Sequence, residues 1–433
     1  MPVVVYLTDV PGPEFLMRPA SLLSSFLLLA GCAGTDAAPG WQAVRDTIGD
    51  TVVVRTVAGS VWGAPRVLEE DLSIGVEEGA PEEMFGDLRS IAVAPDGAIY
   101  VMDPEPALRK FDRTGHFVGT FGRLGSGPGE YRSPDGGLVV LRDGRVVIRD
   151  PANGRLQLVT ADGKPAGQWP LRTGFNTSRR LGRDTADNVY TLVLLESQPD
   201  PMNWRMGLRR YAPDGTERDT IPVPEWKVER MLITGQREGS SNINDVPFSP
   251  RAHWDWSPFG YFVGGTSDRY RIDLLRPAGV LRLERDVPSV AVDPAESAAR
   301  KSEATEQMRR SFPDWTWNGP EIPSTKPWFR GLFVGADGRI WVRRSQPGVE
   351  DESGEWTEPT LFDVYEPDGR FLGEASGPDG FRTWPEPVFA GDTAWAAVES
   401  AEGVLRVKRL VARPLGRASP SLQSGRGRRA PPG

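Results

Sequence analysis

The chain has very little cysteine and histidine: one Cys and two His among 433 residues. A single cysteine has no partner for an internal disulfide, so burial between elements must hold the fold together. Because His116 and His253 are the only histidines, a zinc site with three histidine ligands is impossible and the commonest general base is scarce. The sequence also lacks a Gly-x-Ser-x-Gly elbow, a paired-cysteine metal motif and a phosphate-binding loop. The enzyme classes that these motifs mark are therefore excluded.

Positive charge is not in excess. The formal net charge at pH 7 is −8, and the body of the chain is more acidic still, because residues 1–32 and 413–433 hold six of the basic residues. Nucleic-acid recognition starts from a basic surface, so we expect no nucleic-acid partner. The acidic exterior mainly keeps the protein soluble, and we expect a monomer.

The apolar stretch near the N-terminus is short. Ala20–Ala30 has eleven residues, whereas a bilayer span needs about 20, and it follows Arg18. These features are typical of a secretory signal. Residues 1–16 contain acids but no Lys or Arg, so we expect Met17 to be the true start. Residues 1–31 are then a signal peptide that is removed rather than folded.

The stretch ends in Leu29-Ala-Gly-Cys32, which resembles the lipobox of bacterial lipoproteins. The resemblance implies cleavage before Cys32 and lipidation of that residue; the alternative is a buried structural thiol. By similarity to Gram-negative sorting rules, Ala33 in place of Asp implies anchoring to the outer membrane, on its periplasmic or outer surface. Residues 32–50 are then the lipidated cysteine and a flexible tether, and 413–433, rich in Arg, Ser, Pro and Gly, a disordered tail.

A phrase of short strands and glycine turns recurs along residues 51–412. Its clearest copy runs from Ile91 through Pro95-Asp-Gly97 to Asp103 and continues from Leu108 to Gly115. Five further copies follow at Leu138–Gly163, Leu181–Gly215, Trp254–Gly279, Leu332–Gly369 and Val388–Leu410. Self-similarity at a period of about 40–50 residues, with about four strands per unit, is typical of a β-propeller. The predicted fold is therefore all-β, a six-bladed β-propeller.

The last copy offers only three clear strands and ends with Val404–Leu410. The N-terminal run Arg66–Ile74 is a natural fourth strand, and this pairing would close the ring and leave few open sheet edges. The insertion 288–327 breaks the strand pattern with strong helix formers in Pro294–Arg310. This helix either roofs part of the channel mouth or covers a blade edge.

In a propeller blade, successive turns alternate between two faces. The tight Asp-Gly turns share one of them, the turn face. The opposite loop face collects the long connections: Gly122–Pro134, Ser197–Trp204, Pro224–Pro250, Pro288–Pro327 and Ser345–Pro359. Long loops on one side of a rigid scaffold are where binding sites usually lie, so we expect the ligand site at the channel mouth on the loop face.

Charged residues recur at that mouth. Four of the six copies place an arginine where the channel-lining strand begins: Arg89, Arg180, Arg251 and Arg330. A ring of guanidinium groups could bind a carboxylate, phosphate or sulfate. Acids recur where the second strands end on the same face: Asp103, Asp150, Glu196 and Glu399. In the alternative interpretation, these acids pair with the arginines and fill the channel with salt bridges.

The chain contains 14 tryptophans, and several fall near the loop face: Trp254, Trp256, Trp315, Trp317, Trp328 and Trp384. Exposed tryptophans can stack on sugar rings, whereas propellers also bury aromatic residues between blades. A carbohydrate platform and an ordinary core are therefore both open interpretations.

Residues Ser90–Asp103, Leu108–Gly115 and Thr120–Tyr131 resemble NHL repeats, and the whole chain resembles the six-bladed β-propeller lipoproteins of Gram-negative bacteria. That family has no settled activity to transfer. Calcium-dependent lactonases of a related propeller type use carboxylates and amides at the channel mouth. Asp103, Asp150 and Glu196 could imitate part of that site, although the neighbouring arginines would oppose a cation.

Two hypotheses of function follow. In the favoured one, the protein is a lipid-anchored, non-catalytic module of the cell envelope that binds a polar or anionic small ligand or an envelope protein, with no catalytic residue, metal or cofactor. In the other, it is a carboxylate- or metal-dependent hydrolase or lactonase of the NHL-like type. Calcium bound at Asp103 and Asp150 would favour the enzyme.

Overall fold

The computed structural model describes residues 40–415, apart from 104–106, 173–174, 198–203 and 238–239. The expected signal peptide, the expected lipidation site Cys32 and most of the expected tail lie outside the described residues. Within these ranges, no helix is both long and apolar enough to cross a membrane.

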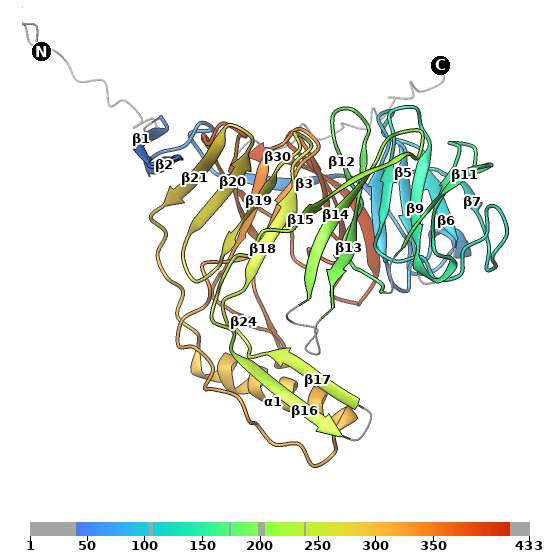
Figure 1. Ribbon diagram of the computed structural model, residues 1–433. Coiled ribbons are helices and arrows are strands. Elements are labelled where there is room, and N and C mark those ends of the chain that lie inside the picture. The colour runs from blue at the N-terminus through green and yellow to red at the C-terminus, as the bar shows by residue number, and fades with distance from the viewer. Residues whose placement is uncertain (1–39, 104–106, 173–174, 198–203, 238–239, 416–433) are drawn as a thin grey trace, which may run out of the picture. The chain divides into compact units, whose positions relative to one another are not determined.

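Most of this chain forms four-stranded antiparallel sheets, which we call units I to VI (Figure 1). In the first three units, the strands follow one another in sequence order. Unit I contains β4 (Ser90–Val93), β5 (Ile99–Met102), β6 (Leu108–Phe111) and β7 (Phe117–Phe121); unit II contains β8 (Leu138–Val140), β9 (Val146–Asp150), β10 (Arg155–Val159) and β11 (Pro165–Pro170); unit III contains β12 (Gly182–Arg183), β13 (Val189–Glu196), β14 (Arg205–Tyr211) and β15 (Glu217–Pro222).

Units IV to VI keep this order, and units IV and VI also receive strands from the N-terminal segment. Unit IV contains β18 (Ala252–Trp256), β19 (Phe262–Thr266), β20 (Arg271–Arg276) and β21 (Gly279–Arg285); unit V contains β22 (Phe329–Val334), β23 (Ile340–Arg344), β26 (Leu361–Tyr365) and β27 (Phe371–Ser376); unit VI contains β28 (Val388–Ala390), β29 (Thr393–Glu399), β30 (Leu405–Pro414) and β3 (Arg66–Ile74). The antiparallel pairing of β3 with β30 is the pairing that the sequence predicts. A short parallel contact of β27 with β3 joins units V and VI.

Unit IV is extended at its outer edge by two strands that the sequence did not predict. β2 (Thr51–Ala58) pairs in parallel with β21, and β1 (Gln42–Ile48) pairs with β2. β1 lies inside the expected tether, 32–50, so this part of the tether is a strand instead. The physical reason is packing, because Trp41 and Ala43 lie against the hydrophobic core between units IV and V.

The hydrophobic core lies between the units. Each unit packs on the next through a cluster of buried apolar side chains, and unit VI packs on unit I in the same way. At the V–VI junction, Trp341 stacks on Phe389 with ring centroids 4.4 Å apart. At the VI–I junction, Val407 and Ile91 share one cluster. Fully burying each large apolar side chain contributes about 1.5–3 kcal/mol to the stability of these junctions. The fold is therefore all-β and propeller-like.

The Asp-Gly turns have the backbone that the sequence predicts. At Pro95-Asp-Gly97, Gly97 has φ +87°, and its amide donates to Ala94 O at 2.9 Å. Asp96 accepts from the amide of Ala98 at 3.0 Å. Glycine is suited to this position because side chains disfavour positive φ.

Two long connections of the loop face meet to form one module. The hairpin of β16 (Leu232–Arg237) and β17 (Ser240–Asp245) comes from the first, and α1 (Pro294–Ser311) comes from the second. Figure 1 shows them together, on the same side of the sheets as the small hairpin of β24 (Val349–Glu350) and β25 (Trp356–Thr357). Their shared core consists of Ile233, Val246, Met308, Phe312 and Trp315. The helix thus packs on the hairpin, a partner that neither expected placement included.

Candidate functional site on the loop face

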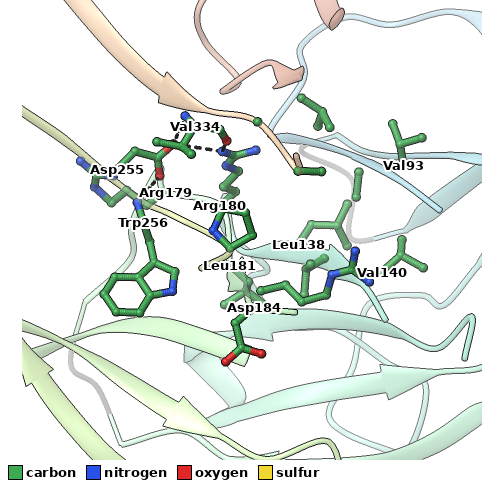
Figure 2. A pocket seen from close by; sticks show the side chains of 18 of the residues that line it. Val93, Leu138, Val140, Arg179, Arg180, Leu181, Asp184, Asp255, Trp256 and Val334 are labelled. Atoms are coloured by element: carbon green, nitrogen blue, oxygen red, sulfur yellow. Dashed lines mark hydrogen bonds and ion pairs between the residues drawn. The ribbon is translucent and has the colours of Figure 1, made fainter. Parts of the chain in front are cut away.

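Arg180 is a predicted arginine that contacts several units at once. It immediately precedes Leu181 and β12 of unit III, and its Nη2 donates to Asp255 Oδ2 at 3.0 Å and to Val334 O at 2.6 Å (Figure 2). Its Nε lies 3.7 Å from Glu386 Oε2. One guanidinium thus connects unit III with units IV and V and with the segment before unit VI.

The partners of Arg180 are themselves held in place. Asp255 also accepts from the amides of Val334 and Trp256, both at 2.7 Å. Burial lowers the pKa of Arg180, but Asp255 and Glu386 together raise it above its ordinary value. Burial raises the pKa of Glu386, because the opposing influence of Arg179 and Arg180 is smaller. The four charged groups form what we call the Arg180 cluster: Arg179, Arg180, Asp255 and Glu386.

Two other predicted arginines lie around His253 of β18. The pKa of His253 is lowered to about 4, first by burial and then by the positive charges of Arg251, Arg179 and Arg330. Arg251 Nε lies 3.2 Å from Asp245 Oδ2, and Arg330 Nη1 lies 2.7 Å from Glu358 Oε1. The Arg251 and Arg330 side chains are 53% and 41% exposed, so both remain accessible from solvent.

The fourth predicted arginine, Arg89, lies at another junction. Its Nη1 donates to Pro134 O at 2.7 Å, which ties unit I to the segment before unit II. The predicted arginines are therefore distributed over three places: Arg180 at the centre, Arg251 and Arg330 near His253, and Arg89 between units I and II.

The four predicted acids contact other residues. Asp103 pairs with Arg109 at 2.7 Å, Glu196 with Arg205 at 3.6 Å, and Glu399 with Arg382. Asp150 accepts from the amides of Arg132 and Ser133, each at 3.0 Å, and from the side chain of Asn153 at 2.7 Å. The partners of Arg180, Arg251 and Arg330 are instead Asp255, Glu386, Asp245 and Glu358, which sequence reasoning missed.

One feature of the sequence could have revealed one of these acidic partners. Asp255 lies between Trp254 and Trp256 inside a channel-lining strand, where an acid is unusual unless it is paired. The other three acids lie outside the first strands, and Glu386 is 206 residues from Arg180, so no local spacing could connect them.

Most of the predicted tryptophans serve the fold. Trp256 is only 7% exposed. The indole nitrogens of Trp315 and Trp328 donate to backbone oxygens, and Trp317 packs beside Trp315. Trp384 is 41% exposed, and Trp254 lines a large groove.

This groove, which we call the aromatic groove, lies between units III and IV and has a volume of about 1190 Å³. Its lining comes from the start of β14, the segment that follows β15 and the start of β18, all on the loop face. The charged and tryptophan side chains among these residues are Trp204, Arg205, Glu225, Trp226, Lys227, Arg230, Arg251 and Trp254.

Positive charge exceeds negative charge in the aromatic groove. Arg230 and Arg251 share one carboxylate, that of Asp245, at 2.6 and 3.2 Å. Lys227 is exposed and forms no ion pair within the described part of the chain, and Glu225 is the one acid in the lining. The groove therefore offers cationic donors and indole rings within a protein of net charge −8.

No metal centre is present in the described ranges, since no group of three or more His, Cys, Asp or Glu side chains there could hold an ion. The described residues therefore provide no set of ligands that would support the hypothesis of calcium bound at Asp103 and Asp150.

No protein-family model and no curated protein matches this chain. Among solved structures, it is similar to a DUF4221 family member from Bacteroides vulgatus, with 10% identity, 81% of this chain and 99% of the other covered, and a TM-score of 0.48. It is also similar to an exported protein of Bacteroides fragilis, with 11% identity, 81% of this chain and 94% of the other covered, and a TM-score of 0.42. A third similar structure is the calcium-binding protein regucalcin of Agrobacterium tumefaciens, with 13% identity, 81% of this chain and 99% of the other covered, and a TM-score of 0.36. At these values the similarities assign no function.

Proposed function

We propose that this protein is an exported, lipid-anchored, six-bladed β-propeller that acts as a non-catalytic binding module, and that its aromatic groove binds an acidic polysaccharide. The observation that carries the proposal is the groove itself, with a volume of about 1190 Å³, an excess of cations and half-buried indole rings on the loop face. The hydrolase or lactonase alternative has no comparable support.

The count of six blades rests on packing. Six four-stranded units have hydrophobic clusters at all six successive junctions, including the one between unit VI and unit I. The pairing of β3 with β30 brings the N-terminal and C-terminal strands into one sheet. In this proposal, that pairing closes the ring.

The indole rings of the groove are held in fixed positions. Trp226 lies over Gly264, where an added Cβ would approach Trp226 Cζ2 to 2.6 Å, so only glycine leaves room for the ring. The Arg179 guanidinium lies 3.5 Å from the ring centroid of Trp254, and Phe262 contacts the same indole edge-on at 5.5 Å. Rigid indole faces suit the apolar faces of sugar rings, and the cations suit carboxylates.

The backbone that lines the groove argues against an added peptide strand. Pro222 and Pro224 have no amide hydrogen, and the Val223 amide already donates to Met206 O at 2.9 Å. An incoming strand would therefore find no free donor along Pro222–Pro224. A ligand would therefore be recognised by the side chains of the groove rather than by its backbone. The volume of the groove exceeds that of a typical small-molecule pocket, which favours a polymer as the ligand.

The test is binding of polygalacturonate to the full-length protein, compared with the neutral polymer dextran and with poly-L-glutamate. We expect Lys227→Glu and Trp226→Phe each to weaken polygalacturonate binding about tenfold, which corresponds to about 1.4 kcal/mol. Binding should also weaken as salt is added. Dextran should not bind.

The matched control is Lys164→Glu, which makes the same charge change at an exposed lysine in the turn between β10 and β11. It should leave binding within twofold. Equal affinity for poly-L-glutamate, together with no effect of Trp226→Phe, would mean that the groove recognises negative charge alone. This result would refute the proposal that it binds an acidic polysaccharide.

The anchor is tested separately. Metabolic labelling with a radioactive fatty acid should label the wild type in a Gram-negative host and should fail with Cys32→Ser. Labelling that persists in this variant would refute lipidation at Cys32.

A further inference from the structure

A second cavity lies where the first strands of the six units meet, and we call it the axial cavity. It has a volume of about 140 Å³, and residues from the first strands of all six units line it. Thr185, Pro258 and Ala336, which follow first strands, line it as well. This axial cavity therefore extends toward the turn face, the side on which sequence reasoning expected no site.

One part of the wall of the axial cavity is aliphatic, and the rest carries the charged side chains of Arg142, Arg179, Arg180, Arg183, Asp184 and Asp255. Figure 2 shows Val93, Leu138 and Val140 on one side and Leu181 with Arg180 on the other. An apolar cavity of about 150 Å³ accommodates a group of the size of benzene. The axial cavity is thus large enough for one compact apolar group.

Two hydrogen-bond donors in its lining lack acceptors. Nη2 and Nε of Arg180 face Asp255, Val334 and Glu386, whereas Nη1 has no partner among the residues described. Figure 2 shows a terminal nitrogen of this guanidinium on the side away from Asp255. Trp256 is 7% exposed, and its Nε1 is buried without a hydrogen-bond partner in the same ranges. Buried donors are normally satisfied, so Trp256 Nε1 is a place for a ligand acceptor. Nη1 of Arg180 belongs to a side chain that is 20% exposed, so it is a second, accessible donor.

The charge balance limits what could bind. Asp255 and Glu386 already offset much of the positive charge of Arg179 and Arg180. A dianion would meet both carboxylates at short range, whereas a single negative charge could be bound by the remaining Arg180 donor.

We propose that the axial cavity binds a small monocarboxylate with a compact apolar body, with its carboxylate on Nη1 of Arg180 and its body against the aliphatic wall. Trp254 lines both the axial cavity and the aromatic groove, whereas Trp226 and Lys227 line only the groove and so distinguish the two sites.

The experiment measures binding of benzoate and of its neutral analogue benzamide to the full-length protein by calorimetry. We expect benzoate to bind and benzamide to bind about tenfold more weakly or not at all. Val140→Phe fills the cavity from its wall and should weaken benzoate binding at least about tenfold. Val388→Phe is a second filling variant at a half-buried position, in case Val140→Phe fails to fold. Val118→Phe, at a 53% exposed position of β7, is the control and should change nothing.

Three results would overturn the proposal: no benzoate binding to the wild type, equal affinity for benzamide, or full binding in a folded variant whose cavity is filled. Lys227→Glu separates the two sites, because it should weaken polygalacturonate binding and leave benzoate binding unchanged. Failure of one ligand alone therefore identifies which proposal is wrong.

Discussion

Two charged clusters cross junctions between units, and they differ in how exposed their central carboxylates are and in whether a spare donor lies beside the axial cavity. Between units IV and V, Asp363 is 0% exposed and accepts from Tyr270 Oη at 2.5 Å and from Arg285 Nη1 at 2.7 Å. Arg285 and Arg344 both donate to Glu374 at 2.9 Å. In the Arg180 cluster, by contrast, the Asp255 and Glu386 side chains are 11% and 21% exposed, and Nη1 of Arg180 is unpaired within the described ranges.

The difference separates a structural cluster from a candidate site. Both Asp363 oxygens have partners, and Tyr365 donates to Tyr270. Arg344 Nε is the one nitrogen of this cluster that is buried without a hydrogen-bond partner in the described ranges. Burial raises the pKa of Asp363 despite Arg285 and Arg344. The Arg180 cluster uses the same residue types but lies beside a cavity. Its residual exposure and spare donor, rather than its composition, are what make it a binding candidate.

The largest effect should come from Asp363→Ala. This change leaves Arg285 and Arg344 without the buried carboxylate between them, and breaking a buried ion pair on one side costs about 3–5 kcal/mol. Urea unfolding should show that loss in the free energy of unfolding, while benzoate binding stays intact. A loss below about 1 kcal/mol would contradict the structural role.

The next effect is a pH dependence near the loop-side mouth. The pKa of His253 falls from 6.5 to about 4 on folding, first because of burial and then because of Arg251, Arg179 and Arg330. The unfolded chain therefore binds the proton more readily, so stability is present above pH 6.5 and is lost as the pH falls toward 4. The loss should reach about 3 kcal/mol. Unfolding of the wild type and His253→Phe, measured between pH 7 and pH 4, should diverge by that amount; parallel curves would contradict the shift.

Much of the fold could be predicted from local pattern. The Asp-Gly turns, the alternation of strands, the helix from Pro294 and the pairing of Arg66–Ile74 with the last strand all follow from spacing. Side-chain partners do not follow from spacing. Glu386 reaches Arg180 across the ring, and the hairpin β16–β17 meets α1 although a whole unit separates them in sequence. The addition of β1 and β2 to unit IV depends likewise on a surface that only the folded sheets create.

A smaller loss of stability should follow Arg180→Gln. Asp255 and Glu386 would lose their shared cation, but their side chains are 11% and 21% exposed, so water can replace part of the interaction. We expect about 2 kcal/mol, near the cost of an unsatisfied buried group. Calorimetric unfolding should therefore rank Arg180→Gln between Asp363→Ala and the surface variants, with benzoate binding lost. If Arg180→Gln lowered the free energy of unfolding as much as Asp363→Ala does, the two clusters would be energetically equivalent. The greater exposure of the Arg180 cluster would then not distinguish it from the structural cluster.

The smallest effect should come from Arg251→Ala. Its guanidinium is 53% exposed, and Asp245 keeps a second partner, because Arg230 Nη2 lies 2.6 Å away. Exposed ion pairs contribute at most about 1 kcal/mol, so thermal unfolding should change little. Polygalacturonate binding should nevertheless weaken, because Arg251 lines the aromatic groove. Arg251→Ala would then weaken binding without lowering stability, as expected of an exposed side chain that contacts a ligand. A large loss of stability with unchanged binding would instead show that Arg251 has a structural role, like the residues around Asp363.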